Sequence, residues 1–144
     1  MPVIVVGADT AVGREIIDAL IEPDREVRAF VSDLDAAEQL KRQGVKVALG
    51  DVSDPSHVMG ACLNAFSAVL VTEAASDDRE RAFARTPDRV IQGWVEAVTE
   101  AAVTRVIWVG EGSRPTPGIE SATVALAETD VAARVVALDD AAEI

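Results

Sequence analysis

The chain has 144 residues, enough for one domain with a substantial core, and 49% of them are hydrophobic, which excludes wholesale disorder. Its 25 acidic and 13 basic residues give a formal net charge of −12, which argues against nucleic acids and anionic membranes as partners. The one cysteine, Cys62, cannot form an internal disulfide, and no apolar run approaches the length of a membrane span, so we expect a cytoplasmic protein.

The chain opens with a predicted strand, a glycine turn and a helix. The apolar run 3–6 ends at Gly7, and a helical pattern follows over residues 12–21 with Gly13 in its first turn. A helix that begins at a strand end directs free backbone N–H groups and a positive dipole outward, where a phosphate can bind. Gly7 allows the sharp turn and Gly13 allows close packing of helix on strand, as in dinucleotide-binding domains.

Strand-like runs and helical patterns then alternate. In chain order we predict a strand at 26–31, a helix at 36–43, a strand at 45–49, a helix from 55 to about 66, a strand at 68–72, a loop or loosely held helix at 74–86, a helix at 87–102, a strand at 105–109, a helix at 119–127 and a strand at 132–138.

The strands are short and rich in valine and isoleucine, which is typical of a parallel sheet that helices cover on both faces. Six strand–helix units in succession predict a doubly wound α/β fold in three layers, with the Rossmann strand order 3-2-1-4-5-6. In such a sheet the ligand is expected at the carboxyl edge of the strands. We interpret residues 1–144 as a single nucleotide-binding domain.

Three segments resemble a known family. Residues 7–13 read Gly-Ala-Asp-Thr-Ala-Val-Gly, residues 27–32 read Val-Arg-Ala-Phe-Val-Ser, and residues 50–55 read Gly-Asp-Val-Ser-Asp-Pro. The chain thereby resembles the NmrA-like NAD(P)-binding proteins of the atypical short-chain dehydrogenase/reductase group. Their corresponding segments read Gly-x-x-Gly-x-x-Gly, Val-Arg-Ala-Leu-Val-Arg and Gly-Asp-Leu-Thr-Asp-Pro. The resemblance covers most of the chain, and the third segment is the most specific match.

The resemblance implies a binding site for NAD or NADP. The glycine loop would shape the pyrophosphate site, and Asp51 would bind the adenine, helped by the backbone of Val52. Asp33 stands about where a ribose-binding acid belongs. The alternative role is a helix cap for Asp33 and a helix-side turn or cap for Asp51. The expected cofactor-binding residues are Gly7, Ala8, Asp9, Thr10, Ala11, Val12, Gly13, Ser32, Asp33, Asp51, Val52, Thr72, Glu73 and Ala74.

The chain also departs from the family pattern in the glycine loop and after the second strand. Thr10 replaces the middle glycine, which places a β-branched side chain where the backbone should approach a phosphate. Ser32 stands where NADP-preferring relatives usually carry an arginine, so no clamp for a 2′-phosphate is evident, and NAD is slightly favoured. Arg14 could reach such a phosphate, although a solvated helix charge is the simpler interpretation.

The catalytic pair of the group is missing. The chain has no tyrosine, and its lysines are Lys41 and Lys46, so the usual tyrosine with a lysine four residues later cannot form. The sequence also lacks the C-terminal half with which longer relatives bind substrate. We therefore predict no catalytic residues. The only histidine, His57, is expected at the surface and indicates no metal site.

Four functions remain open from the sequence. The leading hypothesis is a nucleotide-sensing or regulatory NAD(P)-binding protein. The second is an NAD(P)H-dependent oxidoreductase that uses other groups, such as Glu111, Ser113 or a residue of a partner subunit. A regulatory domain like those of potassium channels is the third, although the spacing of residues 7–13 argues against it. The fourth is a degenerate Rossmann scaffold that binds other proteins.

Two further expectations concern surfaces. The helix at 87–102 carries an apolar stripe that includes Trp94, and with the helix at 12–21 it suggests a homodimer. The polar segment before it has arginines alternating with acids, which is typical of a solvated face or, alternatively, of a lid over a bound anion. These arginines are Arg79, Arg81, Arg85 and Arg89.

Overall fold

The computed structural model describes residues 1–76, 84 and 86–144. In chain order the elements are β1 (Val3–Val6), α1 (Ala11–Leu20), β2 (Val27–Val31), α2 (Leu34–Arg42), β3 (Lys46–Leu49), α3 (Pro55–Cys62), β4 (Ser67–Val71), the 3₁₀ helix η1 (Thr72–Ala74), α4 (Pro87–Ala101), β5 (Arg105–Val109), β6 (Glu120–Val124) and α5 (Val131–Asp140).

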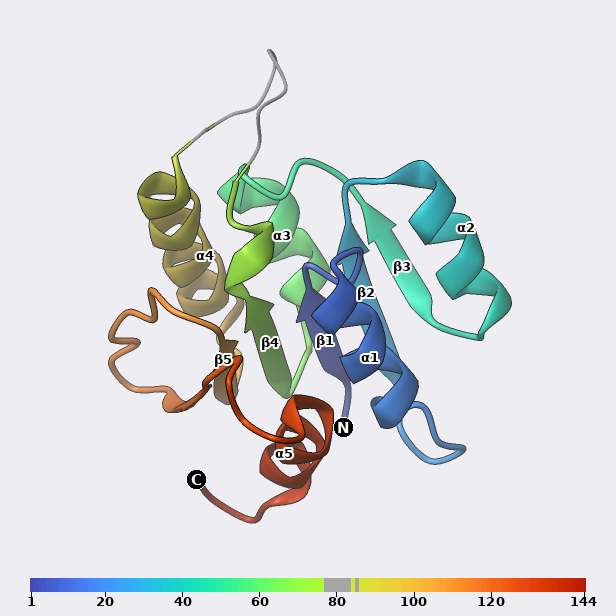
Figure 1. Ribbon diagram of the computed structural model, residues 1–144. Helices are drawn as coiled ribbons and strands as arrows, with labels where there is room; N and C mark the ends of the chain where they lie inside the picture. Colours follow the sequence, from blue (N-terminus) through green and yellow to red (C-terminus); the bar gives the residue numbers. More distant parts are fainter. Residues whose placement is uncertain (77–83, 85) are drawn as a thin grey trace.

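The described strands form one parallel sheet in the order β3-β2-β1-β4-β5-β6, which confirms the predicted Rossmann order (Figure 1). Because all strands run the same way, the loops that follow them meet at one edge of the sheet. Both marked chain ends lie toward the other edge (Figure 1). No helix among the described residues is long and apolar enough to cross a membrane.

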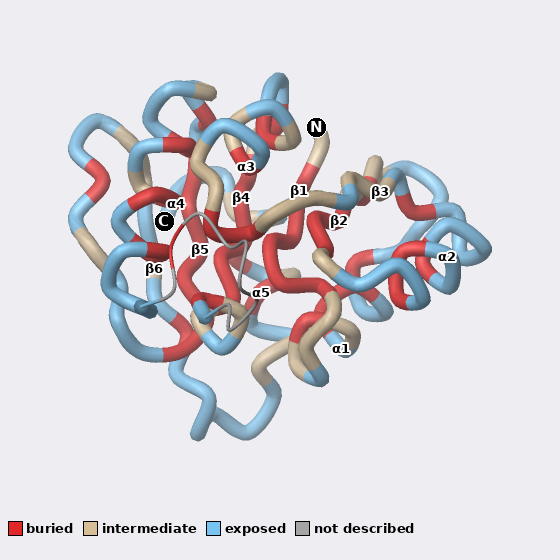
Figure 2. The backbone as a smooth tube through the Cα atoms, turned by 90° about the horizontal axis from the view of Figure 1, so that it is seen from above, coloured by how far each residue is buried: buried red, intermediate tan, exposed pale blue. Residues whose placement is uncertain are grey.

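Two apolar cores hold the three layers together. One lies between the sheet and helices α1, α2 and α5, and the other between the sheet and helices α3 and α4. Every residue of β1, β4 and β5 is buried, whereas the edge strand β3 is exposed or half-buried along its length. Seen from above, the buried central strands lie between more exposed helices (Figure 2). Burial of both faces explains the unbroken valine and isoleucine runs.

Side chains cap the helices where the sequence places short polar residues. The N-caps of α1, α2 and α3 are Thr10, Asp33 and Asp54, and each accepts a hydrogen bond from a backbone N–H in the first turn. Pro55 begins α3, as predicted. Gly44 follows α2 with a φ of +87°, a left-handed conformation that favours glycine.

The prediction for the last two elements was wrong. Residues 120–124 form the sixth strand where we expected a helix, and α5 covers the stretch predicted as that strand. In β6 the side chains of Ser121 and Thr123 alternate with more buried neighbours, which is the period of an edge strand. In α5 the buried residues Val135 and Leu138 are three apart, which is helical spacing. A short apolar run alone does not distinguish the two structures.

Arg105 joins the end of α5 to the sheet at the edge opposite the glycine loop. Its buried guanidinium pairs with Glu120 at 2.7 Å and donates to the carbonyl oxygens of Leu138 and Ala141 at 2.8 and 2.7 Å. It also lies 5.1 Å from the ring centre of Phe66. A buried cation with this many acceptors holds β5, β6 and α5 together.

Candidate functional site

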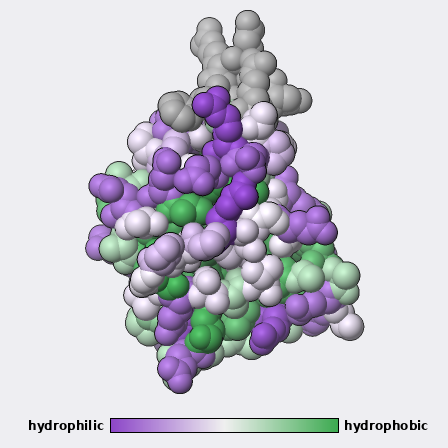
Figure 3. Space-filling view, turned by 90° about the vertical axis from the view of Figure 1, so that its left-hand side faces the viewer, coloured by the Kyte–Doolittle hydropathy of each residue, from purple (hydrophilic) through white to green (hydrophobic). Residues whose placement is uncertain are grey.

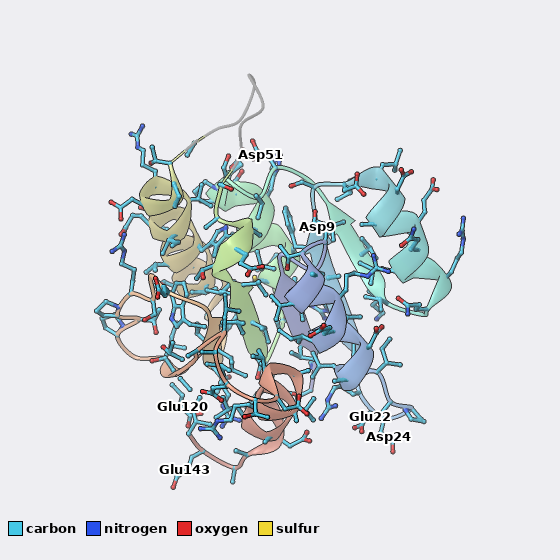
Figure 4. All side chains as sticks on the ribbon, in the orientation of Figure 1. Asp9, Glu22, Asp24, Asp51, Glu120 and Glu143 are labelled. Carbon is cyan, nitrogen blue, oxygen red and sulfur yellow. The ribbon has the colours of Figure 1, made fainter. Side chains whose placement is uncertain are left out.

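The sequence-predicted site residues all follow strands at the carboxyl edge of the sheet. Asp9 and Asp51 lie toward this edge, whereas Glu120, Glu22, Asp24 and Glu143 lie toward the other one (Figure 4). The structure therefore brings the loops after β1, β2, β3 and β4 to one side of the molecule, as the strand order requires.

The glycine turn after β1 is as tight as the sequence predicts. Gly7 has a φ of +90°, and a Cβ at Gly13 would lie 2.1 Å from the carbonyl oxygen of Gly7. A Cβ at Gly7 itself would lie 2.7 Å from the Cβ of Ala74, so the turn touches η1. No side chain fits at Gly13 without moving α1 away from β1, and the turn is therefore a backbone cradle of the kind that approaches a pyrophosphate.

Thr10 fits this turn by acting as a cap. Its hydroxyl donates to the Gly7 carbonyl at 2.7 Å and accepts from the Gly13 N–H at 3.0 Å. The hydrogen-bond ladder of α1 begins with the bond from the Arg14 N–H to the Thr10 carbonyl. The N–H groups of Ala11 and Val12, in the first turn, precede this ladder. These two groups are the donors that α1 offers to an anion.

At the end of β2, the Asp9 carboxylate reaches across from the glycine loop. Its Oδ2 accepts from the Ser32 N–H at 3.0 Å, and the Ser32 hydroxyl donates to the Gly50 carbonyl at 2.9 Å. Asp33 instead turns toward α2, where its Oδ2 accepts from the Ala36 N–H at 2.9 Å. Asp33 thus takes the capping role that was its alternative, and the acid held against the end of β2 is Asp9.

The turn after β3 is a hydrogen-bonded structure in its own right. Asp51 Oδ1 accepts from the N–H and the hydroxyl of Ser53 at 2.9 and 2.6 Å. The Val52 carbonyl accepts from the indole N–H of Trp94 at 2.8 Å, and the Ser53 hydroxyl accepts from the Ala84 N–H at 3.0 Å. The predicted adenine-binding segment is therefore fixed to α4 by a buried side chain.

Sequence reasoning missed two residues that support this turn. Trp94 was predicted only as part of an apolar stripe, and its polar role has no sequence signal. His57 is exposed, as predicted, but its Nδ1 accepts from the Asp51 N–H at 3.1 Å. Its position two residues after Pro55, in the first turn of the helix that follows Asp51, is the signal that could have indicated this contact.

A cavity of about 750 Å³ opens beyond η1, between the carboxyl ends of β4, β5 and β6. Its polar side chains are those of Thr72, Glu73, Glu111, Ser113 and Thr123, and no basic residue is among the described residues that line it. Thr72 donates to the Val109 carbonyl at 3.0 Å and so ties η1 to the end of β5. The cavity is thus continuous with the expected cofactor-lining segment.

The remaining candidates are bound to other parts of the protein, are buried in its core or lie outside the described residues. The Arg14 guanidinium donates to the Gln39 side chain of α2 at 3.1 Å. Arg79, Arg81 and Arg85 lie outside the described residues. Cys62 is buried in the core, where desolvation raises the pKa of its thiol to about 12. No cluster of three or more potential metal ligands occurs in the described part of the chain.

The apolar stripe of α4 belongs to the protein's own core. Ile91, Trp94 and Val98 are buried against the sheet. The view onto this side of the molecule shows hydrophilic areas interspersed with smaller hydrophobic ones (Figure 3). The exposed face of α4 is largely polar and carries Asp88, Arg89, Gln92, Glu96, Thr99 and Glu100.

Comparison with known proteins agrees with this geometry. The model of a family described as NAD(P)H-binding matches residues 7–138. Among curated proteins, the photosystem II assembly factor Ycf39 of Cyanophora paradoxa is 34% identical over 61 residues, which are 42% of this chain and 19% of that protein. The chain therefore aligns with about a fifth of the length of that relative.

Solved structures share the fold. The structure described as ChuY, an anaerobilin reductase from Escherichia coli O157:H7, has a TM-score of 0.72 at 18% identity and covers 99% of this chain and 92% of its own. The triphenylmethane reductase of Citrobacter sp., complexed with NADP(H), has a TM-score of 0.61 at 23% identity, covering 75% of this chain and 37% of its own.

Proposed function

The chain belongs to the NAD(P)H-binding family, and on this premise we propose that it binds an adenine dinucleotide across the carboxyl edge of its sheet as a nucleotide-sensing or regulatory protein. The observation that carries the proposal is the turn at Gly7 and Gly13, where a Cβ at the second glycine would lie 2.1 Å from a carbonyl oxygen. Glycine loses more conformational entropy on folding than other residues do. The close approach of backbone that it permits is what a pyrophosphate site requires.

The loops of the edge provide a place for each part of the nucleotide. The pyrophosphate would lie over residues 7–13, with the N–H groups of Ala11 and Val12 as donors. The adenine would lie by the turn at Asp51 and Val52, and the nicotinamide end by Thr72, Glu73 and Ala74. In an oxidoreductase, a nicotinamide bound there would supply or accept a hydride.

The residues available support a role without tyrosine-dependent reductase chemistry. The chain has no tyrosine, so a phenol cannot protonate a substrate carbonyl. Under this proposal the residues 1–144 act as one nucleotide-binding domain whose bound state is read by a partner. A cytoplasmic location and a slight preference for NAD over NADP belong to the same proposal.

The second candidate is an NAD(P)H-dependent oxidoreductase with other catalytic groups. It is favoured by the cavity next to Thr72, where Glu111 and Ser113 could hold or move a proton near the nicotinamide. The structure described as an anaerobilin reductase has nearly the same length as this chain, so a chain of this size can carry reductase activity.

One experiment tests binding, and a second separates the two candidates. Mass spectrometry of the purified protein and calorimetry with NAD, NADH, NADP and NADPH should detect a dinucleotide, and no heat at millimolar concentrations would contradict the proposal. Steady-state oxidation of NADH and NADPH should then show no turnover with carbonyl, quinone and linear tetrapyrrole substrates. Turnover that Glu111→Gln abolishes would favour the oxidoreductase.

Homodimer formation stays a prediction, and the surface through which two copies would pair must be a different one. The stripe of α4 that suggested it is buried within one copy, so pairing on this helix would join polar residues. A stable interface buries on the order of 1,200 Å² or more. Light scattering at tens of micromolar decides between monomer and dimer.

A further inference from the structure

We propose that Asp9, in the glycine loop, is the residue that makes this protein prefer NAD(H) to NADP(H). Its carboxylate would accept a hydrogen bond from the 2′-hydroxyl of the adenosine ribose and repel the 2′-phosphate of NADP(H). The proposal rests on dinucleotide binding at the carboxyl edge, and it replaces Asp33, the acid that the sequence suggested for this role.

The first observation is where Asp9 is held. Strands β1 and β2 pair directly, with Val6 opposite Phe30, so the loop after β1 lies beside the end of β2. Asp9 Oδ2 accepts from the Ser32 N–H at 3.0 Å, which fixes the carboxylate at the end of β2. In dinucleotide-binding sheets an acid at this place binds the ribose 2′-hydroxyl. Here the acid arrives from the glycine loop.

The second observation is that the carboxylate retains an oxygen for a ligand. Among the residues that the structure describes, the Ser32 N–H is the one group that donates to the Asp9 side chain, and it binds Oδ2. Asp9 is only half-buried, so Oδ1 can accept from a ribose hydroxyl. The bond to Ser32 holds the side chain in place before the nucleotide arrives, which lowers the entropy cost of binding.

The third observation concerns the neighbours that could reverse this preference. Asp33 caps α2 through its bond from the Ala36 N–H. The Ser32 hydroxyl donates to the Gly50 carbonyl, and the Arg14 guanidinium to the Gln39 side chain. A 2′-phosphate entering here would thus meet the Asp9 carboxylate, while the Ser32 hydroxyl already has a protein acceptor. The one bond that Arg14 makes to Gln39 directs its guanidinium toward α2.

Charge repulsion between the Asp9 carboxylate and a 2′-phosphate should be large enough to measure. A phosphate monoester carries between one and two negative charges near pH 7. Within a few ångströms of a half-buried carboxylate, such a phosphate is repelled more strongly than it would be by a fully exposed carboxylate. The reason is that less water and salt screen the two charges. We expect Asp9→Asn to change the affinity ratio of NADPH to NADH by about tenfold or more in favour of NADPH.

The test compares three proteins by calorimetry with NADH and NADPH at two ionic strengths. Asp9→Asn removes the charge but keeps an oxygen that can accept from Ser32. Asp33→Asn is the matched control, because it removes a charge of the same kind and asparagine still caps a helix. We expect the wild type and Asp33→Asn to prefer NADH, and Asp9→Asn to lose that preference. Circular dichroism checks that all three proteins fold alike.

The outcomes separate this inference from the proposed function. If the wild type binds neither nucleotide, both are overturned. If it binds both but Asp9→Asn leaves the ratio unchanged, or if the wild type prefers NADPH, dinucleotide binding stands and the role of Asp9 is wrong. A shift caused by Asp33→Asn instead would return the role to Asp33.

Discussion

The indole nitrogen of Trp94 donates a 2.8 Å hydrogen bond to the carbonyl oxygen of Val52. This bond connects the buried face of α4 to the turn after β3, which is about 40 residues earlier in the chain. The long helix that follows the polar segment therefore positions the loop on which adenine binding is proposed.

The first prediction follows from this bond. Trp94→Phe leaves the buried Val52 carbonyl without its partner, so unfolding free energy should fall by about 1–3 kcal/mol beyond the loss from the smaller ring. Dinucleotide affinity should fall several-fold because the turn loosens. Urea denaturation and calorimetry measure the two effects.

Trp108→Phe is the matched control for that substitution. Trp108 is buried in the same core, but within the described residues its indole N–H has no acceptor. Its replacement should cost less stability than Trp94→Phe and leave nucleotide affinity unchanged. Equal losses in the two variants would show that ring size, and not the bond to Val52, determines the result.

The second prediction concerns Gly13. Gly13→Ala places a Cβ 2.1 Å from the Gly7 carbonyl oxygen, so α1 must move away from β1. We expect at least a tenfold loss of dinucleotide affinity, equivalent to about 1.4 kcal/mol. Gly13→Val should abolish binding. Calorimetry on the folded variants measures the loss.

Gly60 provides the control for adding a methyl group to a helix. A Cβ at this position in α3 would meet nothing within 4 Å. Gly60→Ala should therefore stabilise the protein by about 0.5–1 kcal/mol and leave nucleotide binding intact. Normal nucleotide affinity in Gly13→Ala would show that the close packing is not needed for the site.

The third prediction concerns Arg105. Arg105→Ala leaves Glu120 and the carbonyl oxygens at the end of α5 without their buried cation, so unfolding free energy should fall by about 3–5 kcal/mol. Arg105→Lys should recover only part of the loss, because an ammonium cannot reproduce both bonds to one Glu120 oxygen together with the bonds to the α5 carbonyls. Chemical denaturation measures both variants. An unchanged unfolding free energy in Arg105→Ala would contradict the role of this arginine in holding β5, β6 and α5 together.

The fourth prediction is a pH dependence at the start of α3. The hydrogen bond from the Ser56 hydroxyl, together with backbone N–H groups, lowers the pKa of Asp54 below its ordinary value. A carboxyl whose pKa is lower in the folded state stabilises the protein above the unfolded-state pKa of about 3.9. That contribution is lost as the pH falls through the folded-state pKa.

Denaturation from pH 7 to pH 2 tests this prediction with Asp54→Asn as the reference. Asparagine can still cap α3 but does not titrate. The stability difference between the wild type and the variant should shrink as the pH falls below about pH 4. A difference that does not change with pH would mean that the charge of Asp54 adds nothing to the cap.

The sequence predicted the parts of the fold that local chemistry decides. Glycines at positions 7 and 13 and a proline at 55 indicated the turn and a helix start, because few other residues satisfy those backbone geometries. No such residue marks β6 and α5, for which the sequence predicted a helix and a strand. Alanine-rich runs suit either structure, and only the tertiary neighbours decide which face is buried.

The candidate site was predictable in its place and less so in its contacts. Strand order alone puts the loops after β1, β2 and β3 at one edge. The direction of a side chain within a loop depends on three-dimensional neighbours, so the sequence did not show that Asp33 caps α2 or that Asp9 meets the Ser32 N–H. The bond from Trp94 to Val52 spans two distant segments, and no pattern in either segment announces it.

The two chain ends lie away from the glycine loop, toward the amino edge of the sheet (Figure 1). A protein anchored to a sensor surface through either end would therefore present its carboxyl edge to the flowing solution. Purification handles or fluorescent fusions could be joined there without lying over residues 7–13. The same arrangement would let a neighbouring protein tether this chain by its ends while nucleotide exchange continues on the opposite side.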